Sequence, residues 1–220
     1  MMKWIHHFST FKIPFYTYKL NKEDCILYGS SKNTEKSLII LHGTIFISKV
    51  FTNGETLSVA ILNKDHTINI KESTWSPKHH YYKAIALETT YVISFQCKDI
   101  IAQDKIPSII FTKLIKSYQK TIYRHEQMNH IMTHKYIKHR IIQLILFLCQ
   151  EFGLVKKKET IIPFEISQIN ISIIIGSNKV TINKIIKKLC TQMLIKYSRN
   201  KKIILKDPLA LNYIKYSKYK

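Results

Sequence analysis

The chain has 220 residues, and its 35 lysine and arginine residues against 14 aspartate and glutamate residues give a formal net charge of +21 at pH 7. With 45% hydrophobic residues and only five glycines and five prolines, the composition excludes a disordered tail, a collagen-like repeat and a small disulfide scaffold. The length suits one large domain or two small ones, each able to bury a core.

The charge is unevenly placed along the chain. Residues 1–110 carry 13 basic and nine acidic residues, a net charge of +4, whereas residues 111–220 carry 22 and five, a net charge of +17. The basic second half indicates contact with a polyanion, the alternative being a basic surface that only aids solubility.

The four cysteines lie far apart and form no CxxC pair, so we expect reduced thiols rather than a zinc ribbon or a thioredoxin-type motif. The longest apolar run, Ile141 to Cys149, is far shorter than the roughly 20 residues that a membrane span needs. We therefore expect a soluble protein with no membrane partner.

Residues 26–100 alternate apolar and polar residues over short runs, which predicts strands at 37–41, 44–51, 56–62, 82–87 and 90–95. Asn53-Gly54 is a strong signal for a tight hairpin turn between two of them. Strands at this spacing predict an antiparallel sandwich or barrel. The aromatic residues of the first 20 positions favour a strand or clasp that covers this barrel over a base-stacking surface.

Residues 107–151 change to helical periodicity. Apolar residues recur at Ile110, Leu114, Tyr118 and Ile122, which predicts a helix from Pro107 to about Thr133. A helix of this length with one apolar stripe pairs with its own copy or packs on the barrel, and the first alternative predicts a homodimer. A second, strongly apolar helix is expected over 139–152, ended by Gly153.

Residues 160–206 predict a winged helix-turn-helix. Ser167 is a candidate N-cap, residues 169–175 fit either a strand or a helix by composition, and Gly176 can supply a left-handed turn residue before a basic helix over 178–189. We expect a buried cluster of isoleucines between the two helices: Ile171, Ile175, Ile182 and Ile185. A hairpin from Met193 to Leu205 would be the wing. The alternative is a packed helix pair whose lysines are merely solvated.

This order of elements resembles the cyclic-AMP receptor and Fnr family of transcription regulators, within it most closely the nitrogen regulators of cyanobacteria and red-algal plastids. The resemblance rests on His134 to Arg140, Leu146 to Gly153, Ile175 to Lys184 and Ile186 to Ile195. It covers residues 25–212 but not the first 20. It implies an α+β fold: an N-terminal antiparallel β-roll of the cyclic-nucleotide-binding type, a long dimerisation helix and a C-terminal winged helix-turn-helix. The implied domain limits are 1–106, 107–138 and 139–220, the last with a basic tail.

The resemblance also implies the function. Such a protein binds a palindromic promoter site on double-stranded DNA as a homodimer, with RNA polymerase as a further partner, and regulates nitrogen-related genes in a plastid. Catalysis is not expected. The implied DNA contacts are Ser177, Lys179, Val180, Thr181, Asn183, Lys184, Lys201 and Lys202. Lysine stands at 179 and 184 where the family has arginine, so base discrimination is expected to be softer. The alternative is a nonspecific nucleoid-type DNA- or RNA-binding protein with a vestigial sensor domain.

The effector region departs from the family pattern. The family binds a small anion in the barrel, a cyclic nucleotide or 2-oxoglutarate, and the residues implied here are Asn69, Ile70, His80, Thr121, Arg124 and Glu126. His80 and Thr121 replace family arginines, and neutral histidine is a poor carboxylate partner. We therefore expect binding of 2-oxoglutarate to be weakened, altered or lost.

Catalytic and metal-binding signals are weak in this sequence. His130 and His134 are spaced to hold one metal on a helix, but no third ligand falls at matching spacing, so structural histidines are favoured. Nucleotide-binding glycine motifs, a serine nucleophile elbow and the cysteines of an iron–sulfur cluster are absent from the sequence. No metal site is therefore expected.

Overall fold

The computed structural model describes residues 2–28, 36–69, 80–101, 108–156, 159–198 and 200–211. The chain forms two compact units, Met1–Glu126 and Gln127–Lys220, and the division falls inside the long helix α3 (Ser108–Met132). The three domain limits inferred from the sequence stay a prediction. Within the described ranges, no helix is both long enough and apolar enough to cross a membrane.

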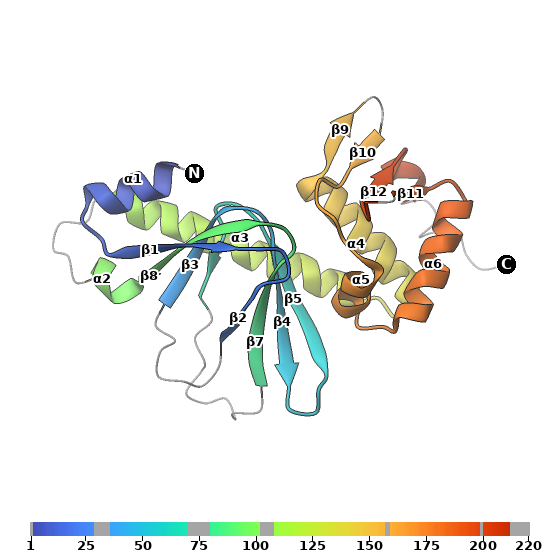
Figure 1. Ribbon diagram of the computed structural model, residues 1–220, viewed down its shortest axis with the longest axis horizontal. Coiled ribbons are helices and arrows are strands. Elements are labelled where there is room, and N and C mark those ends of the chain that lie inside the picture. The colour runs from blue at the N-terminus through green and yellow to red at the C-terminus, as the bar shows by residue number, and fades with distance from the viewer. Residues whose placement is uncertain are drawn as a thin grey trace. The chain divides into compact units, whose positions relative to one another are not determined.

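The first unit contains two four-stranded antiparallel sheets (Figure 1). The first sheet has the order β1-β8-β3-β6, formed by Phe15–Leu20, Thr90–Gln96, Lys36–His42 and Thr67–Ile68. The second sheet has the order β2-β7-β4-β5, formed by Cys25–Tyr28, His80–Ala86, Ile45–Phe51 and Thr56–Leu62. The five predicted strands are confirmed, and Gly54 has the positive φ of 83° expected in the β4–β5 hairpin. Strand β1 falls in the first 20 residues, where a strand or clasp was predicted, whereas β2 and β6 were not predicted.

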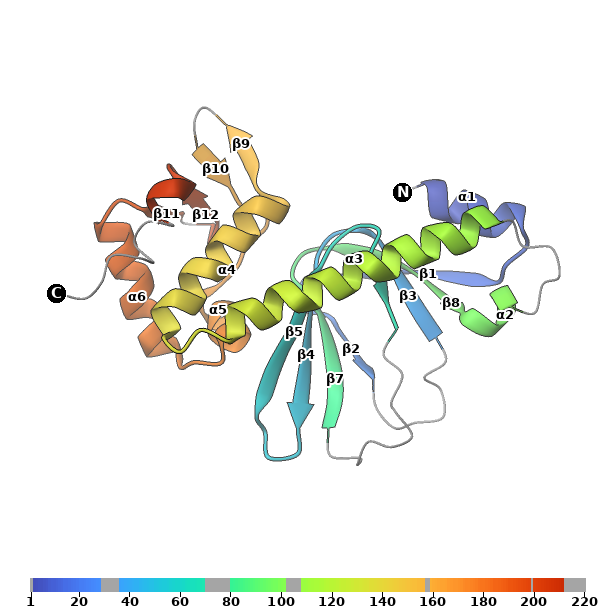
Figure 2. The same ribbon diagram turned by 180° about the vertical axis from the view of Figure 1, so that it is seen from behind.

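Alternation along the strands of the first sheet builds a core on each of its faces. Leu38, Ile40 and Val92 pack against Ile45 and Ala84 of the second sheet. The intervening residues pack against three helices, α1 (Met2–Thr10), α2 (Cys97–Ile101) and the first half of α3. Figure 2 shows α1 and α3 beside this sheet. The first sheet is therefore the central layer of this unit, which matches the predicted α+β class.

The N-terminal segment covers the first sheet, as predicted, but its first part is a helix. Trp4 and Phe8 of α1 are buried against Ile39, Phe95 and Ile110, and β1 then adds an edge strand. Phe8 is fully buried and its ring meets that of Phe95 edge-on at 5.2 Å, so it is unavailable for base stacking.

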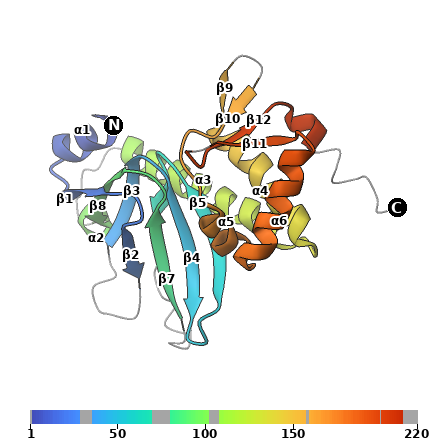
Figure 3. The same ribbon diagram turned by 45° about the vertical axis from the view of Figure 1, so that its right-hand side comes forward.

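The second unit contains the end of α3, then α4 (Ile137–Phe152), α5 (Gln168–Ile175) and α6 (Lys179–Thr191), seen in Figure 3. The second predicted helix and its end at Gly153 are confirmed by α4. A small antiparallel sheet completes the unit, in the order β11-β12-β10-β9, formed by Ile195–Tyr197, Ile203–Leu205, Glu159–Ile161 and Leu154–Lys156.

Candidate nucleic-acid interface

A left-handed glycine makes the turn between α5 and α6. Gly176 has φ 68° and ψ 47°, and its N–H donates to the carbonyl of Ile173 at 3.3 Å. The next N–H, that of Ser177, donates to the carbonyl of Ser172 at 3.0 Å. These bonds satisfy the last carbonyls of α5 and turn the chain sharply, as a helix-turn-helix requires.

Side-chain caps set where both helices begin. The Ser167 hydroxyl accepts from the N–H of Asn170 at 3.0 Å, which confirms the predicted N-cap and makes residues 168–175 helical rather than extended. Asn178 Oδ1 accepts from the N–H of Thr181 at 2.8 Å. This second cap places Lys179 and Val180 in the first turn of α6.

The packing of the two helices decides which side of α6 remains outside. Helix α5 buries Ile171, Ile174 and Ile175, and α6 buries Ile182, Ile186 and Leu189. Of the predicted cluster, only Ile185 differs. It is half-buried, because at 100° per residue it lies beside the buried stripe rather than at its centre.

The opposite side of α6 is exposed and basic. Val180, Lys184 and Lys187 lie on this face at i, i+4 and i+7, and α6 contains four lysines and no acidic residue. Lys179 is also exposed, whereas Ser177, Thr181 and Asn183 are half-buried beside this face. Lys187 was missing from the predicted contacts, although its seven-residue spacing from Val180 was a visible signal.

The predicted wing is confirmed as the hairpin of β11 and β12. Its turn is closed by the N–H of Lys202, which donates to the Ser198 hydroxyl at 3.0 Å. Lys201 is exposed at the tip with φ 53°, and Lys202 is half-buried. Arg199 and residues 212–220, which include the predicted basic tail from Tyr213 to Lys220, lie outside the described residues.

Arg140 holds α4 to the turn that precedes α6. Its Nε donates to the carbonyl of His134 at 2.8 Å, and a terminal guanidinium nitrogen lies 3.4 Å from the carbonyl of Ile175. Met132 also approaches the turn, with its Cε 3.9 Å from where a Cβ on Gly176 would lie. The guanidinium of Arg140 therefore helps to position the turn between α5 and α6 relative to α4.

The predicted effector residues have separate contacts. Asn69 donates to the Tyr118 hydroxyl at 3.2 Å, and the Thr121 hydroxyl binds the backbone of Thr67. His80 instead meets the ring of Tyr82 edge-on at 5.5 Å, on the second sheet. Arg124 is buried and Glu126 is exposed, while Ile70 lies outside the described residues. In the part of the chain that the structure describes, Asn69, Thr121 and His80 thus contact three different partners.

His66 is a buried histidine close to Arg124, one of the predicted effector residues. His66 is 4% exposed, and burial, followed by the positive charge of Arg124, lowers its pKa to about 4. Its Nδ1 lies 3.0 Å from the carbonyl of Asn63 and 3.2 Å from that of Lys64, so Nδ1 carries the proton and donates. His66 is neutral at pH 7 and adds no charge toward an anionic effector.

The remaining histidines and cysteines assemble no metal-binding group within the described ranges, where three suitable side chains never meet. His130 and His134 do line one cavity of about 340 Å³, together with Gln127, Gln143 and Gln150. The described cysteines form no disulfide, and burial raises the pKa of Cys149 to about 12.

Known proteins resemble this chain both in its helix-turn-helix region and over most of its length. Residues 139–214 match the Crp-like helix-turn-helix domain. The ycf28 protein of Porphyra purpurea, whose name proposes an HTH-type transcriptional regulator, is 26% identical over 95% of this chain and 86% of its own length. The global nitrogen regulator of Synechococcus elongatus is 22% identical over 91% of this chain and 90% of its own length.

A solved structure extends the match to the fold. The Crp-family transcriptional regulator TTHB099 of Thermus thermophilus has a TM-score of 0.71, with 13% identity, over 92% of this chain and 98% of that chain. The predicted β-roll and winged helix-turn-helix are therefore confirmed as a Crp/Fnr-like fold.

Proposed function

We propose that this chain is a Crp-family regulator that controls transcription by binding a palindromic DNA site. The proposal starts from its Crp-like helix-turn-helix domain, its Crp/Fnr-like fold and its homology to ycf28 and the global nitrogen regulator. The genes would be nitrogen-related, as the name of the cyanobacterial relatives suggests. Its homologues are regulators rather than enzymes.

The observation that carries the proposal is the exposed face of α6. Val180, Lys184 and Lys187 stand on one side of a helix whose other side is buried, and no carboxylate on that helix opposes a polyanion. A helix of this kind enters the major groove, where lysine donates to guanine O6 and N7 and an apolar side chain meets the thymine methyl group. Ser177 precedes this helix and Lys201 lies at the tip of the wing, and both would contact phosphate.

A homodimer would supply the two-fold symmetry that a palindrome needs. On α3, Ile115 and Ile122 are 55% and 57% exposed, and Phe111 lies on the same side. Their spacings of four and seven residues give a continuous apolar stripe on the face away from the barrel core, suited to a second copy of α3. Crp-family regulators act as dimers, which supports the same arrangement.

We propose that the first unit has altered effector binding. Thr121 already occupies the N–H and carbonyl of Thr67, and His80 contacts aromatic rings rather than the other candidate residues. We expect binding of 2-oxoglutarate to be weak or absent, since neither residue presents a cation to a carboxylate.

Location in a plastid and contact with RNA polymerase are further parts of the proposal. The plastid location is supported by the similarity to ycf28 of Porphyra purpurea and by the use of lysine for 32 of the 35 basic residues, which is typical of AT-rich genomes. The contact with RNA polymerase rests on the resemblance to transcription regulators alone. Immunolocalisation in the source cells would test the first.

A salt-titrated DNA-binding assay tests the function directly. The full chain is titrated with a nitrogen-regulator palindrome and a scrambled duplex of equal length, with and without 2-oxoglutarate. A preference of about 10³ or more for the palindrome is expected. Equal binding to both duplexes that falls steeply with salt would instead establish the nonspecific nucleoid-type alternative, which the lysines of α6 also suit. Enhancement by 2-oxoglutarate would contradict the altered sensor.

A further inference from the structure

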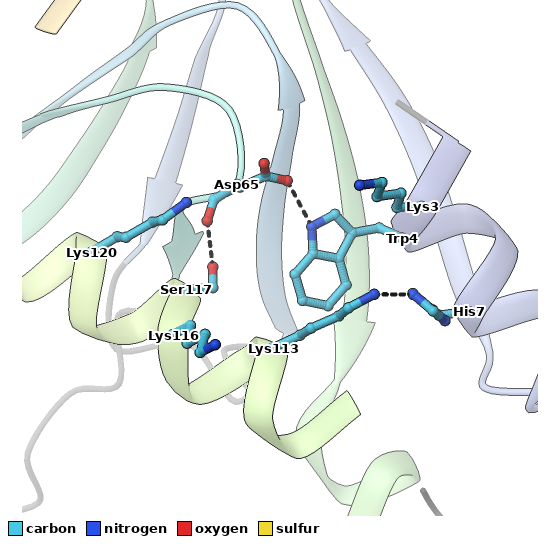
Figure 4. Close-up of a pocket in the computed structure, with 8 residues that line it drawn as sticks. All are labelled: Lys3, Trp4, His7, Asp65, Lys113, Lys116, Ser117 and Lys120. Atoms are coloured by element: carbon cyan, nitrogen blue, oxygen red, sulfur yellow. Dashed lines mark hydrogen bonds between the residues drawn. The ribbon is translucent and has the colours of Figure 1, made fainter. Parts of the chain in front are cut away.

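A small cavity lies between the N-terminal helix and the first half of α3. Its volume is about 200 Å³. Helix α1 and α3 form two walls, and the turn between β5 and β6 forms the third (Figure 4). Its lining residues are Lys3, Trp4, His7, Asp65, Lys113, Lys116, Ser117 and Lys120.

The walls are held by hydrogen bonds that converge on Asp65. The indole N–H of Trp4 donates to Asp65 Oδ1 at 2.9 Å, and the Ser117 hydroxyl donates to the backbone carbonyl of Asp65 at 2.8 Å. Trp4 is only 7% exposed, because the rest of its ring packs in the core beneath. The cavity is therefore a fixed feature of the fold, formed only because α1 covers the first sheet.

Positive charge dominates this cavity. Lys113, Lys116 and Lys120 lie at i, i+3 and i+7, which places them on one side of α3, and Lys3 approaches from α1. In the described part of the chain, none of the four lysines forms a salt bridge. The one carboxylate of the lining, that of Asp65, already accepts from Trp4.

The pKa of His7, another residue of the lining, is lowered in this environment. Burial, and then the charges of Lys113, His6 and Lys3, lower the pKa of His7, so its ring is neutral at pH 7. Neutral Nε2 accepts from the Lys113 ammonium group. Four ammonium groups thus surround a cavity whose lining supplies one negative charge.

We propose that this cavity binds a small phosphate-bearing anion, either free phosphate or pyrophosphate or the phosphate end of a nucleotide. Lysine ammonium groups bind phosphate as point charges, and no bulky apolar group has to be accommodated. The volume is below the 300 Å³ or more that a drug-sized ligand needs, so the base and sugar of a nucleotide would remain outside. The site adjoins the region around Thr67 through Ser117, whose hydroxyl also meets that of Thr67. Its lining includes neither His80 nor Thr121 and no residue of the second unit, and it does not rest on the proposed function.

Trp4 provides the readout. The chain has two tryptophans, so a Trp75→Phe variant leaves Trp4 as the sole one, hydrogen-bonded at the cavity wall. Its fluorescence is followed at constant ionic strength while inorganic phosphate, pyrophosphate, AMP or sodium chloride is added. A saturable change is expected for pyrophosphate, and the comparison of phosphate with AMP separates a free anion from a nucleotide as the source.

Lysine substitutions establish the location. Lys116 and Lys120 are both exposed at the rim of the cavity, so Lys116→Ala with Lys120→Ala should leave the fold intact and weaken binding by about tenfold or more. Lys19→Ala, an exposed lysine on β1, is the matched control and should leave affinity unchanged. A thermal melt checks that each variant is folded. A response that chloride reproduces, an absent response to every phosphate compound, or equal affinity in the double variant would overturn the proposal.

Discussion

The hydroxyl of Thr121 on α3 donates to the backbone carbonyl of Thr67 at 2.9 Å and accepts from the N–H of the same residue at 3.2 Å. Thr67 is fully buried on the short strand β6, and its own hydroxyl meets that of Ser117 one turn earlier on α3. This pair joins the long helix to the barrel, and it gives a structural role to a residue that the sequence had suggested for an effector site.

Removing the Thr121 hydroxyl is expected to destabilise the first unit. Thr121→Val preserves shape but leaves the N–H and carbonyl of Thr67 buried without this partner. We expect a loss of about 2 kcal/mol in the free energy of unfolding, measured by urea titration.

Thr112→Val is the matched control for this substitution. The Thr112 hydroxyl donates to the carbonyl of Ser108 on the exposed side of the same helix, so the expected change is below about 0.5 kcal/mol. Equal losses in the two variants would show that the Thr121–Thr67 contact adds no specific stability.

The protein is expected to lose stability in mild acid because of His66. The pKa of His66 is about 4 in the folded state, below its ordinary value of 6.5, so the unfolded chain binds more protons as the pH falls between these values. The stabilising contribution is complete above pH 6.5. About 2 kcal/mol of it is lost by pH 5, and burial lowers the pKa of His125 in the same direction.

Urea titrations of wild type, His66→Gln and His42→Gln at pH 7 and pH 5 measure this contribution. His66→Gln should be less stable at pH 7 but much less sensitive to pH, whereas His42 is exposed and its variant should follow the wild type. An unchanged pH dependence in His66→Gln would refute the assignment.

Two glycines with positive φ are expected to differ in their tolerance of alanine. A Cβ on Gly43 would lie 2.3 Å from Thr90 Oγ1 and 2.7 Å from Thr90 Cα, so the backbone must move. A Cβ on Gly176 meets nothing closer than 3.9 Å and costs only the left-handed strain, about 1–2 kcal/mol. Gly43→Ala adds a clash to the same strain and should cost about 3–5 kcal/mol. Chemical unfolding of both variants, followed separately in the two units, would contradict this order if Gly176→Ala were the more damaging.

Lys184 is expected to act in DNA binding rather than in folding. Lys184→Ala should weaken binding to the palindrome by about tenfold or more and reduce the slope of log K against log salt by about 1. Lys196→Ala removes the same charge from the wing, where Lys196 pairs with Glu159 at 3.0 Å, and should have a smaller effect. Fluorescence anisotropy at several salt concentrations gives both quantities, and indistinguishable variants would argue against α6 as the reading helix.

The exposed stripe on α3 is expected to hold two copies together. Ile115→Glu with Ile122→Glu should convert a dimer into a monomer and abolish preference for the palindrome, because charges would be buried without partners. Leu57→Glu changes an equally apolar, 44% exposed residue on β5 and should remain dimeric. Analytical ultracentrifugation distinguishes the two, and a dimeric double variant would place the interface elsewhere.

The sequence by itself determined the elements whose signals are local. Alternation over five to eight residues predicted strands β3, β4, β5, β7 and β8, and helical spacing predicted α3, α4 and α6. The glycine at 176 predicted the turn of the helix-turn-helix. The exposed basic face of α6 follows from the same periodicity, since the buried isoleucines leave one side free.

Only the tertiary structure decided the features that depend on distant partners. Helix α1 is nine residues long, too short to be stable alone, and it forms because Trp4 and Phe8 pack on the first sheet. Residues 61 positions apart, Trp4 and Asp65, thereby complete the lysine-lined cavity. The structural role of Thr121 could not be predicted from the sequence either. Its hydrogen-bond partner, Thr67, lies 54 residues earlier in the chain, on a strand that packs against α3 only in the folded protein.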